Sequence, residues 1–288
     1  MNRPKRIFFV SFVVWAGPLI ASEAPRKVLD PQMALRNVPL GEFQPSAYTQ
    51  DNLNQRMAQD TAQLLAQAES GDAAAQMKLA RAYESGLGVP KDDQLAARWY
   101  RRAAEQGDPE AENALGEKYL IGEGIERDKE EATKWFRKSA RQGNATAMYH
   151  LGAAYYNGDG VGIDDSLSYA WFRLAKEAGN QNAADAVQRA ESELKPQTIT
   201  SGFERIAEMY EKGDSLPGNQ AEAARWWSFA AARGDYDAQV ALAVNKLNGQ
   251  GNAQEYSEAR HLCEEVAKQR QEPRAEYCLG YLSAWSWC

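Results

Sequence analysis

The sequence predicts an all-α solenoid in which antiparallel helix pairs are stacked along one axis. Three observations predict it: a 36-residue pattern is written three times in succession, over residues 71–106, 107–142 and 143–178; two glycines stand in the middle of each copy; and β-branched residues are sparse between its aromatic landmarks. A fixed period of about 20 to 50 residues is typical of stacked supersecondary units. Because such arrays expose an extended surface, a binding surface is the first function to consider.

Residues 1–22 are predicted to be a secretory signal peptide. Arg3, Lys5 and Arg6 precede an apolar run over residues 7–16, and small residues follow at Ala21 and Ser22. The run is short for a membrane span, which needs about 20 residues, although a retained N-terminal anchor is the alternative. No cysteine lies near the cleavage region, so a lipid anchor is not expected. The mature chain is therefore expected in the periplasm or outside the cell.

Composition argues against a polyanionic partner. The net charge of the full chain is −7, and removal of residues 1–22 deletes three basic and no acidic residues, which leaves −10. Nucleic acids and anionic membranes require clustered positive charge. We therefore expect protein partners, no nucleic acid, and no integral membrane span once the signal is cleaved.

Before the repeats, residues 23–52 carry four prolines among polar residues and are predicted to be a flexible linker. Residues 53–70 have apolar positions at helical spacing and are predicted to form an N-terminal capping helix.

Each repeat is predicted to contain two helices. In the first copy, Ala75, Leu79, Ala80 and Tyr83 form one stripe of the first helix, and Gly86 and Gly88 end it. The aspartate that follows caps the second helix, whose buried face carries the tryptophan. The predicted repeat core comprises Leu79, Leu115 and Leu151, then Tyr83, Tyr119, Tyr155 and Tyr210, and then Trp99, Trp135, Trp171 and Trp226.

Later repeats depart from the period. Residues 179–233 form a fourth repeat with an insertion of about 19 residues, which contains a further helical stretch from Ala183 to Leu194. Residues 234–270 form a degenerate fifth repeat, in which Lys246 and Leu262 replace the tyrosine and the tryptophan. Residues 271–288 form a partial C-terminal repeat.

The pattern resembles the Sel1-like repeat, a relative of the tetratricopeptide repeat. In the third copy it is carried by Leu151, Gly152, Tyr155, Gly158, Gly160, Val161, Asp164, Trp171 and Phe172. The resemblance implies a right-handed superhelix of antiparallel helix pairs. It also implies an adaptor or scaffold for other macromolecules, which in bacteria often serves envelope assembly, signalling or host contact.

The sequence offers no catalytic, cofactor-binding or metal-binding residues. The Gly-x-Gly elements follow a helix and lack the third glycine of a dinucleotide motif, so they are predicted to be turns. The tryptophans are predicted to be core residues. The two histidines, His150 and His261, belong to no ligand-spaced cluster. Enzyme activity is therefore not expected.

Positions of the first helices that point away from the buried stripe are the predicted partner-binding residues. They are Met77, Arg81 and Glu84, then Asn113, Glu117 and Leu120, and then Tyr149, Ala153 and Tyr156. Tyr149 and Tyr156 are the strongest candidates because aromatic residues are enriched at binding surfaces. An ordinary solvated helix face is the alternative for each position.

Cys263 and Cys278 are equidistant from residues 269–272, the expected turn of the last helix pair. Residues placed in this way face each other in an antiparallel hairpin, so a disulfide is predicted. Two buried thiols are the alternative, and Cys288 is left over.

Three functions are compatible with the sequence. The first is an exported scaffold that binds protein along its superhelical groove. The second is β-lactam binding or hydrolysis, which is implied only by the resemblance to disulfide-bearing relatives. The third is assembly through the aromatic C-terminus, which contains Tyr277, Tyr281, Trp285 and Trp287.

Overall fold

The computed structural model of this chain describes residues 50–248, 253–270 and 279–280, and those residues include the helices α2 to α13 but no β-strand. The all-α fold that the sequence predicts is confirmed. The signal peptide, most of the linker and most of the partial C-terminal repeat lie outside the described residues.

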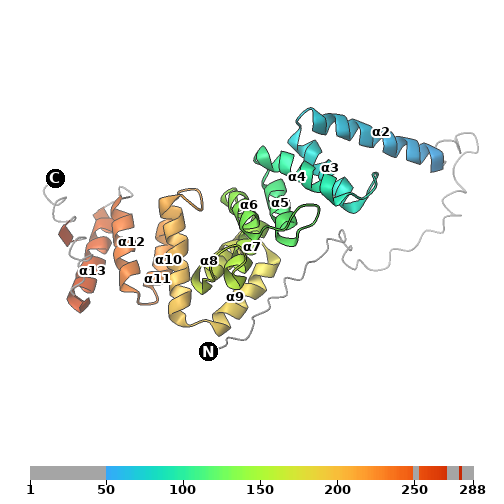
Figure 1. Cartoon of the computed structure of the whole chain (residues 1–288). Helices are drawn as coiled ribbons and strands as arrows, with labels where there is room; N and C mark the ends of the chain where they lie inside the picture. The colour runs from blue at the N-terminus through green and yellow to red at the C-terminus, as the bar shows by residue number, and fades with distance from the viewer. Residues whose placement is uncertain (1–49, 249–252, 271–278, 281–288) are drawn as a thin grey trace, which may run out of the picture.

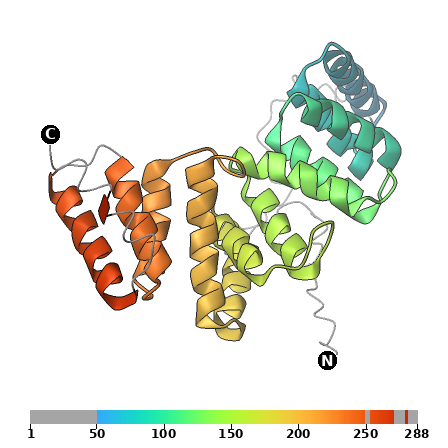
Figure 2. The same ribbon diagram turned by 60° about the vertical axis from the view of Figure 1, so that its left-hand side comes forward.

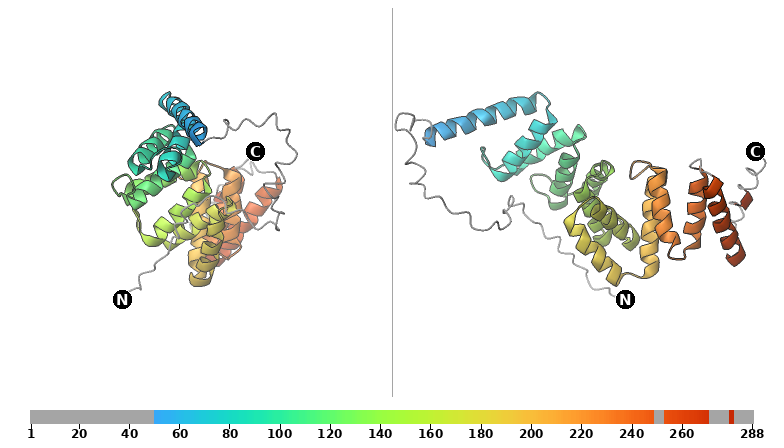
Figure 3. Two further views of the ribbon diagram at one scale, coloured as in Figure 1. Left: turned by 90° about the vertical axis from the view of Figure 1, so that its right-hand side faces the viewer. Right: turned by 180° about the vertical axis from the view of Figure 1, so that it is seen from behind.

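The helices form an elongated row of hairpins that starts with α2 and ends with α13 (Figure 1). After α2 (Gln50–Glu69), the hairpins are α3 (Ala73–Ser85) with α4 (Asp93–Glu105), α5 (Pro109–Ile121) with α6 (Lys129–Arg141), α7 (Ala145–Asn157) with α8 (Asp165–Glu177), α10 (Pro196–Lys212) with α11 (Gln220–Ala231), and α12 (Tyr236–Asn248) with α13 (Ala253–Arg270). Each hairpin also packs on the next one, and α2 packs on α3. The first and last helices lie at opposite ends of the row in Figure 2 and in the right-hand view of Figure 3.

The helix α9 (Gln181–Glu193) interrupts this order. It corresponds to the additional helical stretch expected from residue 183 to residue 194. Both α9 and α10 pack on α8. The helix α8 therefore contacts three helices: its hairpin partner α7, the extra helix α9, and α10 of the next hairpin. Tyr169 shows this arrangement directly, because its hydroxyl donates to Glu191 Oε1 of α9 at 3.0 Å while its ring meets Phe203 of α10 edge-on.

The turn inside each hairpin is built in the same way each time. The N–H of Asp92 donates to the carbonyl of Tyr83 at 2.9 Å, and Asp128, Asp164 and Asn219 repeat this bond to the next three tyrosines. The Asp92 side chain also accepts from the N–H groups of Gln94 and Leu95, which caps α4. One residue therefore closes the loop and starts the second helix.

The second glycine of the turn is required by contact with the preceding repeat in the second and third repeats. Gly124 has φ +72°, and a Cβ at this position would lie 1.9 Å from the carbonyl oxygen of Asp93 at the start of α4. Gly160 has φ +70°, and its Cβ would lie 2.1 Å from the carbonyl oxygen of Lys129 at the start of α6. The turn of one repeat thus rests against the second helix of the repeat before it.

The predicted core residues differ in their degree of burial. Leu79, Leu115 and Leu151 are fully buried, and Trp99, Trp135, Trp171 and Trp226 are buried as well. The four tyrosines Tyr83, Tyr119, Tyr155 and Tyr210 are half-buried, and they pack against the edge of the buried core. Two of their hydroxyls reach the surface and accept from arginines of the preceding helix, Tyr119 from Arg101 at 2.6 Å and Tyr155 from Arg137 at 3.0 Å.

One surface contact spans two hairpins. At the end of α6, Arg141 donates through Nη1 to the carbonyl of Asp214 at 2.9 Å and through Nη2 to the carbonyl of Gly213 at 3.4 Å. These carbonyls belong to the turn between α10 and α11, so the bond passes over the α7–α8 hairpin.

Substitution of Gly124 by alanine tests the close approach between repeats. Gly143 is the matched control, because its φ is +88° but nothing lies within 4 Å of a Cβ there. We expect Gly143→Ala to lose about 1–2 kcal/mol of stability through backbone strain alone. Gly124→Ala should lose a further ~1–3 kcal/mol, because the methyl group displaces the start of α4. Urea unfolding followed by circular dichroism measures both, and equal losses would contradict the contact.

Candidate functional site

The nine predicted contact residues lie on α3, α5 and α7, but three of them are buried. Met77, Asn113 and Ala153 expose 7%, 9% and 5% of their surface, respectively. The prediction of exposed side chains at these positions was wrong, because each first helix packs against a neighbour on either side and leaves a narrower free face. We call the remaining set the first-helix face: Arg81, Glu84, Glu117, Leu120, Tyr149 and Tyr156.

The acidic residues of the first-helix face are tied to the adjacent helices. Glu84 of α3 accepts from the hydroxyl of Tyr100 at 2.7 Å and forms an ion pair with Lys118 of α5. Lys118 exposes only 5% of its side chain and also binds Glu123 at 2.8 Å. Burial opposes the charge on Lys118, but these two carboxylates outweigh it and raise the pKa of its ammonium group. The cluster therefore links the first two repeats.

A second polar link joins α5 to α7. His150 Nε2 lies 3.0 Å from Glu117 Oε1, and the amide of Asn113 donates to the same oxygen at 2.8 Å. Burial opposes ionisation of Glu117, yet the contacts with His150 and Asn113 outweigh it and lower the pKa of its carboxyl. His150 is also stacked on Phe136, with ring centroids 4.7 Å apart. Glu117 and Glu84 thus hold repeats together as well as facing solvent.

The sequence reasoning missed Lys118 and His150 as members of this network. His150 was expected to belong to no ligand-spaced cluster, because its partner Glu117 lies 33 residues away in the chain. The repeat period could have indicated this contact. When first helices stack, a residue on one of them faces the residue slightly less than one period earlier in the chain, on the preceding first helix. Lys118 was assigned no role, although a lysine among apolar neighbours on a helix requires a carboxylate partner.

The tyrosines of α7 make a different surface. The Tyr149 ring lies 5.4 Å from the ring of Phe172 and 6.0 Å from that of His150, and burial raises the pKa of its hydroxyl. About two turns further on, Tyr156 lines a pocket between α7, α8 and α9. We call this the α7–α9 pocket.

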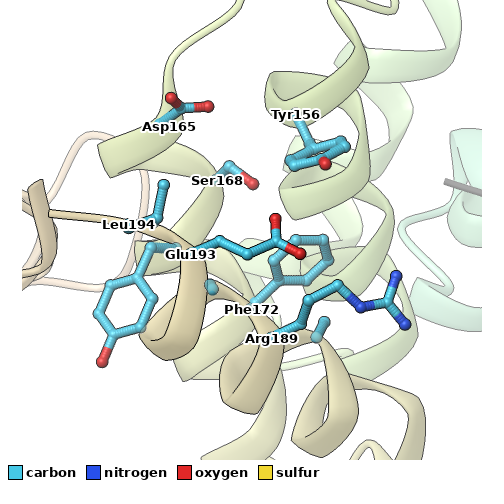
Figure 4. A pocket seen from close by; sticks show the side chains of 10 residues that line it. Tyr156, Asp165, Ser168, Phe172, Arg189, Glu193 and Leu194 are labelled. Atoms are coloured by element: carbon cyan, nitrogen blue, oxygen red, sulfur yellow. The ribbon is translucent and has the colours of Figure 1, made fainter. Parts of the chain in front are cut away.

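Figure 4 shows how the α7–α9 pocket is built. Tyr156 from α7 and Leu194 at the end of α9 lie on opposite sides, with Ser168 and Phe172 of α8 between them. About 20 Å³ is open to the centres of water-sized spheres, which is room for about one water molecule. The total empty space, including the part open to solvent, is about 320 Å³. The pocket suits the tip of one side chain.

Other predicted features have the following positions. Cys263 is fully buried in α13, but Cys278 lies outside the described residues, so the disulfide stays a prediction. The aromatic C-terminal residues also lie outside them.

Within the described ranges, no group of three histidine, cysteine, aspartate or glutamate side chains is arranged to hold a metal ion. None of the helices in those ranges has the length and apolar character needed to cross a bilayer.

Comparison with known proteins identifies the repeat. The sequence model of the Sel1 repeat matches residues 73–108, 109–144, 145–180, 204–235 and 237–270, which together make up more than half of the chain. The gap between the third and fourth matches contains α9. No curated protein matches the chain.

Solved structures give two relatives of similar sequence. One is a protective antigen present in uropathogenic Escherichia coli strains and displaying an SLR fold, with 35% identity and a TM-score of 0.42; the alignment covers 77% of this chain and 51% of the antigen. This chain therefore spans about half the length of that antigen. The other is a Sel1 repeat protein from Oxalobacter formigenes, with 27% identity, a TM-score of 0.37, and coverage of 78% of this chain and 77% of that one.

Substitution of Lys118 by methionine tests the link between the first two repeats. The change leaves Glu84 and Glu123 without their shared cation, so we expect a loss of about 1–3 kcal/mol at pH 7. Lys134→Met is the control, because Lys134 pairs with Glu131 on the surface; its loss should stay within about 0.5 kcal/mol.

The same variant has a defined pH dependence. Lys118 lowers the pKa of Glu123 in the folded protein, so the stabilisation is present above the glutamate pKa of the unfolded chain and is lost as the pH falls through the folded value. The difference between wild type and Lys118→Met should therefore shrink below about pH 4.3. Chemical unfolding at pH 7 and pH 3 measures it, and an unchanged difference would show that the ion pair is not its cause.

Proposed function

Because this chain belongs to the Sel1 repeat family, whose members generally mediate contacts between proteins, we propose that it is an exported, non-catalytic scaffold that binds a protein partner on the first-helix face. The family is typically non-catalytic, which supports the scaffold role over an enzyme. Export rests on the sequence of residues 1–22.

The observation that carries the proposal is the pair of tyrosines on α7. Both are half-buried, so their rings are held by neighbours and lose little freedom when a partner covers them. Tyr156 borders the α7–α9 pocket, which has room for one side-chain tip beside the ring. An aromatic side chain next to a small pocket is the arrangement in which binding energy is concentrated at protein interfaces.

The polar residues of the first-helix face support a different part of the proposal. Glu84 and Glu117 are held in fixed positions by Tyr100, Lys118 and His150, so they present ordered carboxylates beside the tyrosines. Ordered rim charges favour specificity and the rate of association more than affinity. We therefore assign affinity to α7 and selectivity to α3 and α5.

The double variant Tyr149→Ala/Tyr156→Ala tests the binding face. Proteins captured from a bacterial envelope extract by the wild type are identified by mass spectrometry, purified, and titrated against each variant. We expect at least a tenfold weaker affinity, since aromatic anchors contribute roughly 1–2 kcal/mol or more each. Phe229→Ala removes a 39%-exposed aromatic side chain from α11 and should leave the affinity unchanged. Equal binding by all three proteins, with unaltered unfolding midpoints, would place the interface elsewhere.

Expression of the full chain in a Gram-negative host tests export. We expect the protein in the periplasmic or extracellular fraction, with an intact mass that lacks residues 1–22 and is about 2 Da lower under non-reducing conditions because of one disulfide. A chain of full mass in the cytoplasmic fraction would contradict export. Three free thiols in an exported protein would contradict the disulfide alone.

A further inference from the structure

A wide cleft lies on α4, away from the tyrosines of the first-helix face. Its lining includes Leu95, Trp99 and three arginines of α4, and the residues Gly124 and Ile125 of the turn after α5 form its other wall. Its volume is about 600 Å³, compared with about 20 Å³ for the α7–α9 pocket. This volume lies in the range of ligand-binding clefts. We call it the arginine cleft.

The charge of the arginine cleft opposes that of the whole chain. Arg98, Arg101 and Arg102 are all exposed, and Glu105 is the only carboxylate among the lining residues. No carboxylate of the described residues lies within 4 Å of any of the three guanidinium groups. The chain has a net charge of −7, so an uncompensated group of three cations is unusual for it.

Some cations on other second helices form ion pairs. Arg225 of α11 binds Glu177 at 2.6 Å and Glu222 at 2.9 Å. Lys134, which occupies in α6 the position of Arg98 in α4, binds Glu131 at 2.9 Å. Among the described residues Arg98 has no such carboxylate partner, whereas the contacts of Arg101 and Arg102 are repeated in α6 by Arg137 and Lys138.

Two of the three guanidinium groups are already held in position. Arg102 lies over the ring of Trp99, with its Cζ 4.6 Å from the ring centroid. Arg101 donates to the hydroxyl of Tyr119 at 2.6 Å. A guanidinium group has five N–H donors, so each keeps donors for a ligand while losing little freedom on binding. The cleft is preorganised for an anion.

The spacing of the arginines matches an extended peptide. Residues three and four apart on a helix have Cβ atoms about 5–6 Å apart. Alternate side chains of an extended chain are about 7 Å apart, so two carboxylates on alternate residues can each meet one guanidinium group. The apolar part of the cleft, formed by Leu95, Trp99 and Ile125, suits an apolar side chain two residues before or after the carboxylate pair, because only alternate residues of an extended chain face the same side. The cleft occupies one helix and one turn, which is short for a nucleic acid or a membrane surface.

We propose that the arginine cleft binds an extended acidic segment of a protein partner, with two glutamate or aspartate carboxylates on Arg98 and Arg102 and an apolar side chain against Trp99. This site is independent of the first-helix face and would make the chain a scaffold with two docking surfaces on different helices.

Fluorescence anisotropy with a labelled Glu-Ser-Glu-Ser-Leu peptide, whose two carboxylates and leucine lie on one face of an extended chain, tests the proposal on the mature chain. We expect binding that weakens as salt rises from about 50 to 500 mM. The variant Arg98→Gln/Arg102→Gln should bind about 100-fold more weakly, at roughly tenfold for each charged hydrogen-bonding group. Lys134→Gln/Lys138→Gln is the matched control, because it removes the same charge from the corresponding positions of α6; it should bind like the wild type.

Three further results decide the identity of the ligand and of the site. A Gln-Ser-Gln-Ser-Leu peptide should not bind measurably. Binding of a DNA duplex or of phosphatidylserine vesicles as tightly as the acidic peptide would overturn the assignment to protein. The variant Tyr149→Ala/Tyr156→Ala should bind the peptide normally, so failure of the arginine cleft and failure of the first-helix face are distinguishable. Equal affinity of the wild type and Arg98→Gln/Arg102→Gln would reject the site.

Discussion

The stacking of the first three repeats depends on one close backbone contact. The turns of the second and third repeats lie so near the start of the second helix of the repeat before them that Gly124 and Gly160 have no space for a Cβ. Because the contact recurs at a constant offset along the chain, it fixes the relative placement of adjacent hairpins. The buried leucines and tryptophans supply the hydrophobic free energy, whereas this contact determines the geometry in which they are buried.

The helices and turns were predictable because each joint carries its own local signal. Asp92 caps a helix, Gly86 adopts the left-handed conformation that ends one, and Leu79 marks the buried stripe, and these signals recur in each copy. The additional helix was predictable for the same reason, since Asn180 caps α9 as Asn144 caps α7. What the local pattern does not contain is the packing of α9 and α10 on the same helix, α8.

The candidate site was predicted less well because it depends on the rotation between repeats. That rotation determines that Lys118 meets Glu84 and that His150 meets Glu117, and it cannot be read from a single repeat. It also covers Met77, Asn113 and Ala153, which a helix taken alone would expose. Tyr149 and Tyr156 remain half-buried, and Tyr156 borders a pocket to which α9 contributes. The insertion therefore adds a wall to the predicted binding surface that the regular repeat does not supply.

The contact of Arg141 with the turn after α10 has a consequence for cooperativity. In an array with nearest-neighbour contacts only, the free energy of unfolding is close to a sum of repeat and interface terms, and segments can open separately. Arg141 bonds the carbonyls of Gly213 and Asp214 across the α7–α8 hairpin, so that hairpin is bounded by helices that also hold each other. If the α7–α8 hairpin opens alone, the bonds from Arg141 to Gly213 and Asp214 must either span the opened segment or break. The bond therefore couples the opening of the α7–α8 hairpin to the contact between the hairpins on either side of it, across the interruption at α9.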